Sequence, residues 1–578
     1  MVIQELKTEK YAGDKSVKAV SNNKNKGYGK IIGQIILSLY FLMMAAVYPY
    51  YAPGGYLRIG EVKYVFFRNV TFPVLAVMLI LVLGTLIRRP GLLTEYYRRM
   101  SVTDWFAYGY FMTVVLSYLC SSYQEEALWG AEGWHMGTVM QLTLVLLYFL
   151  FSVYFRCSAG WLMVWLTAAA GVFLLGILNR YSIYPIVMEG QTPVFISTLG
   201  NINWFCGYWS VTAPMGMTLY WYSEKRWQKI FASLYSFVAM LAGVVQGSES
   251  AYLVFGAVFA MLLLLSVRTI RRLYRWIELC MIFAAGCQTG RLFRCLPGLQ
   301  MNYGSAVNGG SPTVLERLTD TNITLWALCL LLAVYLMIRL WVCKKGIEDS
   351  DKVRNLCANT FGRIICVMIV MVILCVGFSG LIVRGGLFYQ NEDAVTSGQD
   401  SGQALQLYDD RDSGQVLQLY DDRNYSQVML FREDWGNGRG TAWNCSIEAY
   451  QELDMLHKMF GVGPDCFAAY IYQQPSLAAR LVRRFGTERL TNAHNEGLSI
   501  LLNTGAFGLL FYMGFVISAL VRYSKKAGKQ PLLYVCAVSL LAYTAHNMVS
   551  FQQVLSTPYL FILLGMGEGL FREDKEKA

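Results

Sequence analysis

Long apolar runs separated by short polar segments dominate this chain. A helix that crosses the hydrocarbon core of a membrane needs about twenty mostly apolar residues. Runs of this kind are found at 31–50, 64–87, 102–120, 138–156, 161–180, 196–221, 230–246, 251–267, 276–290, 321–343, 362–384, 497–522, 531–550 and 554–570. The first run is too long for the apolar part of a signal peptide and lacks a clear cleavage site. The pattern predicts an all-α polytopic membrane protein with about fourteen transmembrane helices.

Composition supports this interpretation. Apolar residues make up 55% of the 578 residues, charged residues only 15%, and the mean hydropathy is +0.38. A soluble domain carries about 25% charged residues, so a soluble globular enzyme, a disordered chain and a small disulfide-rich protein are excluded. Lysine and arginine outnumber aspartate and glutamate by 49 to 38. In a membrane protein this excess indicates cytoplasmic loops that face anionic lipid, and no nucleic-acid partner is expected.

Basic residues cluster between alternate apolar runs, and such clusters favour the cytoplasmic side. With the N-terminus inside, five clusters fall on that side: Arg88/Arg89/Arg98/Arg99, Lys225/Arg226/Lys229, Arg268/Arg271/Arg272/Arg275, Lys344/Lys345 and Arg522/Lys525/Lys526/Lys529. The predicted order is a basic cytoplasmic tail at 1–30, helices at 31–384, an extracytoplasmic loop at 385–496, helices at 497–570 and a cytoplasmic tail at 571–578.

The long loop at 385–496 precedes the twelfth predicted helix. At 400–423 it repeats DSGQALQLYDDR as DSGQVLQLYDDR, which is interpreted as a duplication in a tolerant loop tip. Metal binding by the paired aspartates of the repeat is the alternative. Apolar spacing predicts helices at 444–459 and 476–485, so the loop should be partly helical. Most of the fourteen cysteines lie in apolar runs without metal-site spacing, but Cys445 and Cys466 lie in this loop, and a disulfide between them is left open.

A histidine motif follows the loop directly. In the sequence AHNEGLSILLNTGAFGLL, His494 and Asn495 are followed by nine residues and then by Gly505-x-x-Gly508. This pattern resembles the hallmark of the O-antigen ligase and O-antigen polymerase family, and it matches at all four positions. A second His-Asn pair, at His546, lacks the glycines at that spacing. Gly505 and Gly508 are interpreted as glycines that permit close packing of helices.

Further segments resemble parts of the same family, in the family's order. FGVGPDCF is similar to its GxGPxxF turn, GNGRGTAWNCSIEAY to its Arg…Trp segment, STLGNINWFCGY to its Gly-Asn-x-Asn-Phe/Trp stretch, and ALWGAEGWHMG to an outer loop between early helices. The residues that carry these resemblances are Gly461, Gly463, Pro464, Arg439, Trp443, Asn201 and Asn203. The two asparagines are expected to form hydrogen bonds between helices, because unpaired amides are costly in apolar surroundings.

The chain also departs from the family. The turn GSESAY has Glu249 where relatives often carry an arginine. If that arginine binds phosphate in relatives, another arginine must do so here. Fourteen helices slightly exceed the dozen that are usual in the family.

The resemblance implies a GT-C type glycosyltransferase that moves or polymerises glycan from a polyprenyl-diphosphate donor, on the outer membrane face, to a glycan or lipid acceptor. It implies inverting transfer in one step, without a metal or another cofactor. Such a reaction needs a base near the acceptor hydroxyl and cations near the diphosphate. His494 is the expected base, and Asn495 is expected to orient it. The expected diphosphate ligands are the arginines Arg480, Arg483, Arg484, Arg489 and Arg439, because planar guanidinium groups match phosphate oxygens.

Other interpretations stay open. A histidine at a helix start is often a capping residue, and an arginine cluster can be a solvated face or a contact with lipid headgroups. His546 is a further candidate for lining the site. The motifs do not separate ligase from polymerase. The segments GNINW and GSESAY resemble those of relatives from Gram-positive bacteria. This resemblance favours a plasma-membrane enzyme that builds capsule, exopolysaccharide or wall glycan.

Two functions of other classes remain as alternatives. A lipid-linked oligosaccharide flippase should have ionisable residues within its spans and halves related by a repeat, and no such repeat is found in the sequence. A non-catalytic membrane protein that binds or senses surface glycan would keep the fold with a dispensable His494.

Overall fold

The computed structural model describes residues 29–297, 299, 313–346, 431–433, 435–486 and 489–577. The helix predicted at 362–384 and the tandem repeat at 400–423 lie outside the described residues, as does nearly all of the predicted basic tail at 1–30.

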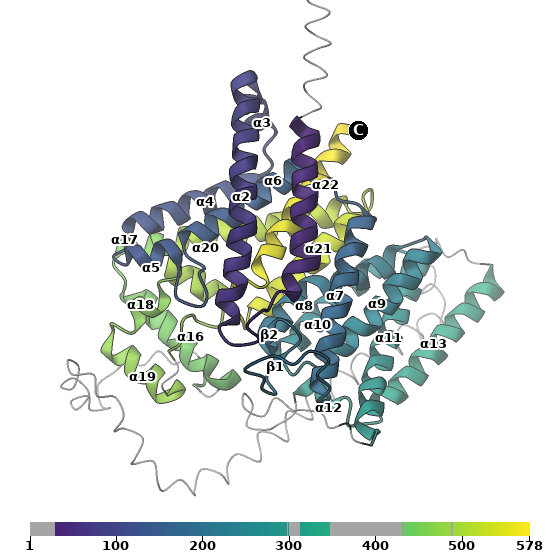
Figure 1. Ribbon diagram of the computed structural model, residues 1–578. Helices are drawn as coiled ribbons and strands as arrows, with labels where there is room; N and C mark the ends of the chain where they lie inside the picture. The colour runs from purple at the N-terminus through teal and green to yellow at the C-terminus, as the bar shows by residue number, and fades with distance from the viewer. Residues whose placement is uncertain are drawn as a thin grey trace, which may run out of the picture.

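A helix occupies each of the thirteen predicted membrane segments within the described residues (Figure 1). These helices are Gly29–Tyr50, α2 (Ile59–Arg88), α4 (Val102–Cys120), α6 (Thr138–Tyr154), α7 (Ala159–Arg180), α8 (Ile202–Tyr222), α9 (Arg226–Val245), α10 (Ser250–Ser266), α11 (Ile270–Cys295), α13 (Ile323–Lys345), α20 (Glu496–Lys526), α21 (Leu532–Asn547) and α22 (Thr557–Lys577). Among the described residues, six helices are long and apolar enough to cross a membrane: Gly29–Tyr50, α2, α7, α9, α13 and α20. The protein is therefore a mostly helical, multi-pass membrane protein, and the total of fourteen spans stays a prediction.

Short elements connect these helices. The first helix ends in a π-helical turn, η1 (Met43–Val47), and a 3-10 turn, η2 (Tyr48–Tyr50). The connections contain α3 (Gly91–Arg99), α5 (Gln124–Trp129) and α12 (Val314–Arg317). Strand β1 (Phe195–Ile196) pairs antiparallel with β2 (Gly200–Asn201). Ser197, between the strands, has a positive φ of 56°, which permits the tight turn. The observed fold thus differs from the predicted all-α class at this place, where a short hairpin has two residues in each strand.

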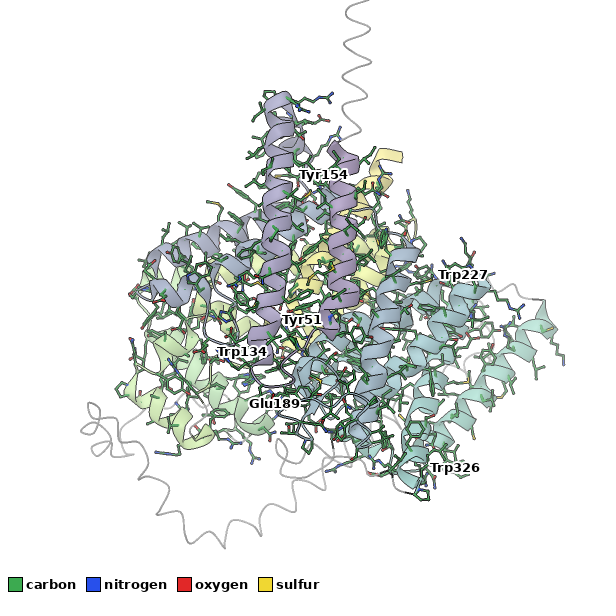
Figure 2. The ribbon with its side chains drawn as sticks, viewed as in Figure 1. Tyr51, Trp134, Tyr154, Glu189, Trp227 and Trp326 are labelled. Atoms are coloured by element: carbon green, nitrogen blue, oxygen red, sulfur yellow. The ribbon has the colours of Figure 1, made fainter. Side chains whose placement is uncertain are left out.

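The helices share one apolar core. α20 packs against α4 and α21, α8 packs against α9 and α21, and α22 packs against α6. Buried aromatic side chains such as Trp165 and Trp209 belong to this core, and Figure 2 shows side chains filling the space between the helices. Trp227 and Trp326 lie at the edge of the bundle in the same figure and are 54% and 70% exposed. Exposed tryptophans of this kind suit a lipid-facing surface.

Buried ion pairs hold the C-terminal helix in the bundle. Arg522 of α20 contacts Glu568 of α22 at 2.7 Å between Nη1 and Oε2. Arg572 of α22 contacts Asp104 of α4 at 2.7 Å between Nη2 and Oδ2. Because Arg572 is anchored in this way, α22 continues to Lys577, through residues predicted to form a cytoplasmic tail from position 571.

The polar segment before α20 forms a helical unit with its own apolar core. Its helices are α16 (Trp435–Glu452), α17 (Met455–Phe460), α18 (Phe467–Ile471) and α19 (Pro475–Phe485). The helix predicted at 444–459 is divided into two, because the side chain of Asp454 accepts a hydrogen bond from His457 N at 3.0 Å and starts α17. Cys445 and Cys466 are both buried in the core of this unit as free cysteines, so they are not joined by a disulfide.

The unit formed by α16–α19, called the outer unit after its predicted side of the membrane, docks on a bend in α20. The bend lies at Gly505, whose φ of 72° and ψ of −172° favour glycine. A Cβ atom there would lie 2.4 Å from the carbonyl carbon and oxygen of Met459. Gly461 has a φ of 77°, and a Cβ atom there would lie 2.3 Å from the carbonyl carbon and oxygen of Asn503. Gly463 N donates to Asn503 O at 3.0 Å. Two glycines from separate motifs therefore let two backbones approach closely.

Candidate functional site

His494 lies directly before α20, at the junction with the outer unit. Asn495 begins the helix, because its Oδ1 atom accepts a hydrogen bond from Leu498 N at 3.0 Å. His494 has a positive φ of 49°, and its backbone N–H donates to Asn492 Oδ1 at 3.0 Å. The imidazole packs edge-on against the ring of Phe551, with centroids 5.3 Å apart. Within the described residues the ring forms no hydrogen bond, so its nitrogens are open to a ligand.

Arg439 is the predicted cation that the structure brings to His494. It comes from α16, and its Nε donates to Val549 O at 3.0 Å while its Nη1 donates to Gly436 O at 2.9 Å. Its Nη2 forms no hydrogen bond with any residue in the described part of the chain. Asn495 Nδ2 donates to Met548 O at 2.9 Å. Arg439 and Asn495 therefore both hold the loop after α21, and the Asn495 side chain also fixes the helix start.

Burial and charge set the protonation state of this pair. Burial, followed by the nearby positive charge of Arg439, lowers the pKa of His494 from 6.5 to about 3. The imidazole is thus neutral at physiological pH. Burial also lowers the pKa of Arg439, and the nearby carboxylate of Glu249 opposes that shift. Arg439 therefore faces the position at which this chain carries a glutamate in the GSESAY turn.

The other predicted arginines lie on α19 and the segment after it. Arg480 is already paired, with Nη1 2.6 Å from Glu448 Oε2 and Nη2 3.0 Å from Glu433 Oε1. Arg489 lies over the ring of Tyr472, with its guanidinium carbon 5.3 Å from the centroid. The remaining two predicted ligands, Arg483 and Arg484, are exposed. The five arginines are therefore distributed over the outer unit, and Arg439 is the one whose charge acts on His494.

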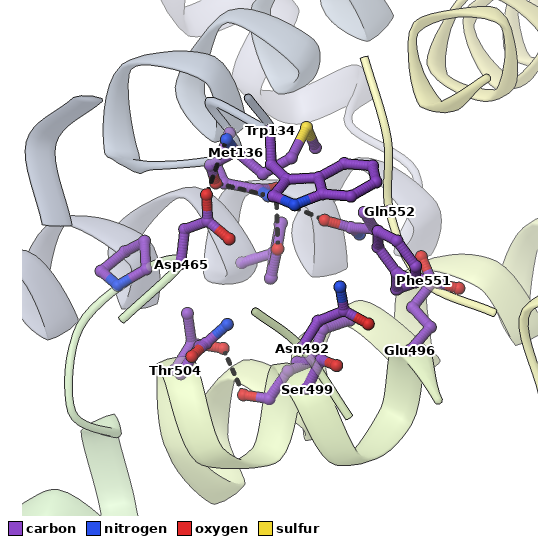
Figure 3. A pocket seen from close by; sticks show the side chains of 14 residues that line it. Trp134, Met136, Asp465, Asn492, Glu496, Ser499, Thr504, Phe551 and Gln552 are labelled. Carbon is purple, nitrogen blue, oxygen red and sulfur yellow. Dashed lines mark hydrogen bonds between the residues drawn. The ribbon is translucent and has the colours of Figure 1, made fainter. Parts of the chain in front are cut away.

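A cavity of about 40 Å³ lies beside the histidine motif (Figure 3). Its lining comes from five regions of the chain: Tyr110 of α4; Trp134, Met136 and Gln141 of the α5–α6 loop and α6; Pro464 and Asp465 of the GxGP turn; Asn492, Glu496, Ser499, Ile500, Asn503 and Thr504 around the start of α20; and Phe551 and Gln552 after α21. Phe551 separates this cavity from His494, because its ring contacts both the imidazole and, at 4.8 Å between centroids, Trp134. Gly508 lies one turn beyond Thr504, buried where α20 packs on α4.

Asp465 is a residue of this site that the sequence interpretation missed. It follows Gly463-Pro464 directly and has a φ of 62°, so that its carboxylate turns back toward the α5–α6 loop. Its Oδ2 accepts from Ala131 N at 2.9 Å and from Met136 N at 3.0 Å. Burial raises the pKa of Asp465 from 3.8 to about 7, although the two backbone hydrogen bonds oppose the shift. The signal available in the sequence was the polar side chain of Asp465 within the FGVGPDCF turn.

The two predicted asparagines have different partners. Asn201 starts α8, with its Oδ1 accepting from Asn203 N at 2.9 Å. Asn203 Oδ1 accepts from Ser248 Oγ at 2.7 Å, which ties α8 to the GSESAY turn. Ser248 and Ser250 share a hydrogen bond at 2.8 Å, and Ser250 Oγ lies 2.9 Å from His546 Nδ1. His546 therefore belongs to a buried polar chain that joins α8, α10 and α21.

Comparison with known proteins identifies the part of the chain that contains this site. Residues 317–513 match the family model described as O-antigen ligase. The matched stretch includes the outer unit, Arg439, Asp465, His494 and the bend at Gly505. No curated protein matches the chain. This part of the chain is therefore similar to the O-antigen ligase family, and the similarity supports a membrane enzyme that processes glycans.

Proposed function

We propose that this protein is a glycosyltransferase of the outer face of the bacterial plasma membrane, which transfers or polymerises glycan from a polyprenyl-diphosphate donor. The acceptor is a second glycan or a lipid. The observation that carries the proposal is the pairing of His494, whose ring has no hydrogen bond within the described residues, with the incompletely paired guanidinium of Arg439. One group is free to accept a proton, and the other is free to bind an anion.

In the proposed step, the acceptor hydroxyl oxygen attacks the anomeric carbon of the donor glycan. The bond between that carbon and the diphosphate oxygen breaks, and the polyprenyl diphosphate leaves with the electron pair. A ring nitrogen of His494 takes the hydroxyl proton. Arg439 stabilises the charge on the leaving diphosphate. Attack from the face opposite the leaving group inverts the anomeric centre, and these residues accomplish the step without a metal ion.

The low pKa of His494 is compatible with this role. Part of the shift comes from the positive charge of Arg439. A bound diphosphate would offset that charge, and this raises the basicity of the imidazole when the donor is in place. His494 is then a stronger base in the complex than in the free protein, which suits a group that must stay unprotonated until the donor binds.

The arginines of α19 and of the segment after it have a different role in the proposal. Arg483, Arg484 and Arg489 are exposed, and their positive charge attracts the anionic donor toward the outer unit. Arg480 is bound to two carboxylates, so it holds α19 to the rest of the unit. Contact with the leaving group is assigned to Arg439.

The test is a comparison of His494→Ala with His457→Ala in a host that lacks the native gene. His457 is a matched control, because it lies in the same outer unit and pairs with Asp454 on an exposed surface. Surface glycan is measured by its length distribution, and lipid-carried glycan is extracted from the membrane. We expect His457→Ala to resemble the wild type and His494→Ala to lose product.

The pattern of loss also separates the two enzyme classes. A polymerase would leave single repeat units on the carrier lipid, whereas a ligase would leave long chains on the carrier with none on the acceptor. Normal surface glycan in His494→Ala, with the variant present in the membrane, would contradict the proposal. That result would favour a flippase or a non-catalytic glycan-binding protein.

A further inference from the structure

The cavity between the GxGP turn and α20 has a chemistry that differs from a diphosphate site. Among its lining residues none is basic, whereas two are carboxylic acids, Asp465 and Glu496. Figure 3 shows that these two acids enter from opposite sides of the cavity. An anionic group would be repelled by this lining. The ligand must therefore be neutral or cationic and must offer hydrogen-bond donors.

The remaining walls combine aromatic rings with side-chain amides. The edge of Trp134 meets Phe551, and Gln141 Nε2 donates to Gln552 Oε1 at 2.7 Å. Asn503 Oδ1 is buried and has no hydrogen-bond partner within the described residues. A buried acceptor without a partner is costly, so it indicates that a donor from a ligand or water completes it. Carboxylates, amides and aromatic faces together suit the hydroxyl groups and apolar C–H faces of a sugar.

The size of the cavity limits what can enter. A water molecule needs about 10–15 Å³ of such space, so a volume of about 40 Å³ holds a few water-sized groups. A complete sugar ring is too large. One hydroxyl-bearing arm of a ring fits, with the ring itself against Trp134 and Phe551.

We propose that this cavity is a sugar subsite, in which Asp465 accepts a hydrogen bond from a hydroxyl group of the acceptor and Trp134 packs against the ring. The assignment of this sugar as acceptor rests on the function proposed above. Asp465 suits the role because its Oδ2 is held by the backbone N–H groups of Ala131 and Met136, which fixes the carboxylate in place. Phe551 separates this arm from the imidazole of His494, so the hydroxyl that gives its proton to His494 is a different hydroxyl of the acceptor, outside the cavity.

The proposal is tested by saturation-transfer NMR with the full-length protein in detergent micelles. The probes are methyl glucoside, methyl galactoside and methyl N-acetylglucosaminide, each at millimolar concentration. The wild type is compared with Asp465→Asn, Trp134→Ala and the control His457→Ala. Asn keeps an oxygen for the two backbone amides but lacks the carboxylate, and the gel-filtration profile of each variant checks that it is folded.

We expect transfer from the wild type to at least one sugar, and at least fivefold weaker transfer from Asp465→Asn and Trp134→Ala. His457→Ala should bind like the wild type, because His457 pairs with Asp454 and does not line the cavity. Absence of transfer to all three sugars, or equal transfer from folded Asp465→Asn, would overturn the proposal and leave a water-filled cavity. Failure of the proposed function would look different, since His494→Ala would then retain glycan output while sugar binding still depended on Asp465.

Discussion

Substitution of Gly505 by alanine tests whether the docking of the outer unit on α20 depends on this glycine. The backbone at Gly505, with φ of 72° and ψ of −172°, lies in a region that is essentially restricted to glycine. A Cβ atom would also lie 2.4 Å from the carbonyl group of Met459. This neighbour is backbone, so it cannot rotate away as a flexible side chain could. Relief requires movement of the turn that follows α17.

The cost of this change can be approximated from the two effects. Backbone strain of this type costs about 1–3 kcal/mol, and overpacking against a fixed neighbour adds about 1–3 kcal/mol. A value of about 3 kcal/mol, in the lower half of the summed range, corresponds to roughly a 100-fold larger open population if it falls on local opening of the turn. Gly528 provides a matched control, because a Cβ atom there meets nothing within 4 Å.

The buried thiol of Cys466 reports this opening. Cys466 lies in the docked turn with 0% exposure. After trypsin cleavage at Lys458 and Arg480 it is the one cysteine in its peptide, so mass spectrometry measures its rate of maleimide modification separately. We expect modification about 100-fold faster in Gly505→Ala than in the wild type, and an unchanged rate in Gly528→Ala. A Gly505→Ala rate within about threefold of the wild type would refute the argument that this glycine holds the turn against α20.

Two further predictions concern the site itself. Arg439→Ala should reduce the initial rate of glycan transfer from extracted lipid-linked donor by about 10²–10³-fold, because a contact with the leaving group is lost. The rate of the control Arg484→Ala, on the exposed face of α19, should stay within about threefold of the wild type. Equal losses in the two variants would contradict the assignment of the leaving-group contact to Arg439. Because the pKa of Asp465 is raised to about 7, its carboxylate is present above that pH and is lost below it, so kcat/KM should fall on the acid side of about pH 7 and this fall should be missing in Asp465→Asn. A wild-type kcat/KM that is constant from pH 8 to pH 5 would show that ionised Asp465 is not required.

Local pattern was sufficient for the helices and for part of the site. The apolar runs predicted helices that are observed wherever the structure describes them, and the motif placed His494 at the start of α20. The division of the 444–459 helix was missed, because one capping hydrogen bond from Asp454 outweighed an apolar spacing that continues across it. The roles of the arginines could not be separated by sequence, because the same residue type occurs exposed, stacked on an aromatic ring and ion-paired in one outer unit.

The sequence by itself determined the membrane character, the positions of the helices and the motif that carries the family resemblance. These properties depend on neighbours in the chain, since transfer of an apolar run into lipid and the start of a helix are local events. Only the tertiary structure decided which charges meet. Arg439 reaches His494 from another helix, and Asp465 binds Ala131, 334 positions away in the chain. Burial then sets the pKa of both His494 and Asp465, and burial is a property of the packed fold, because it depends on residues brought together from every part of the chain.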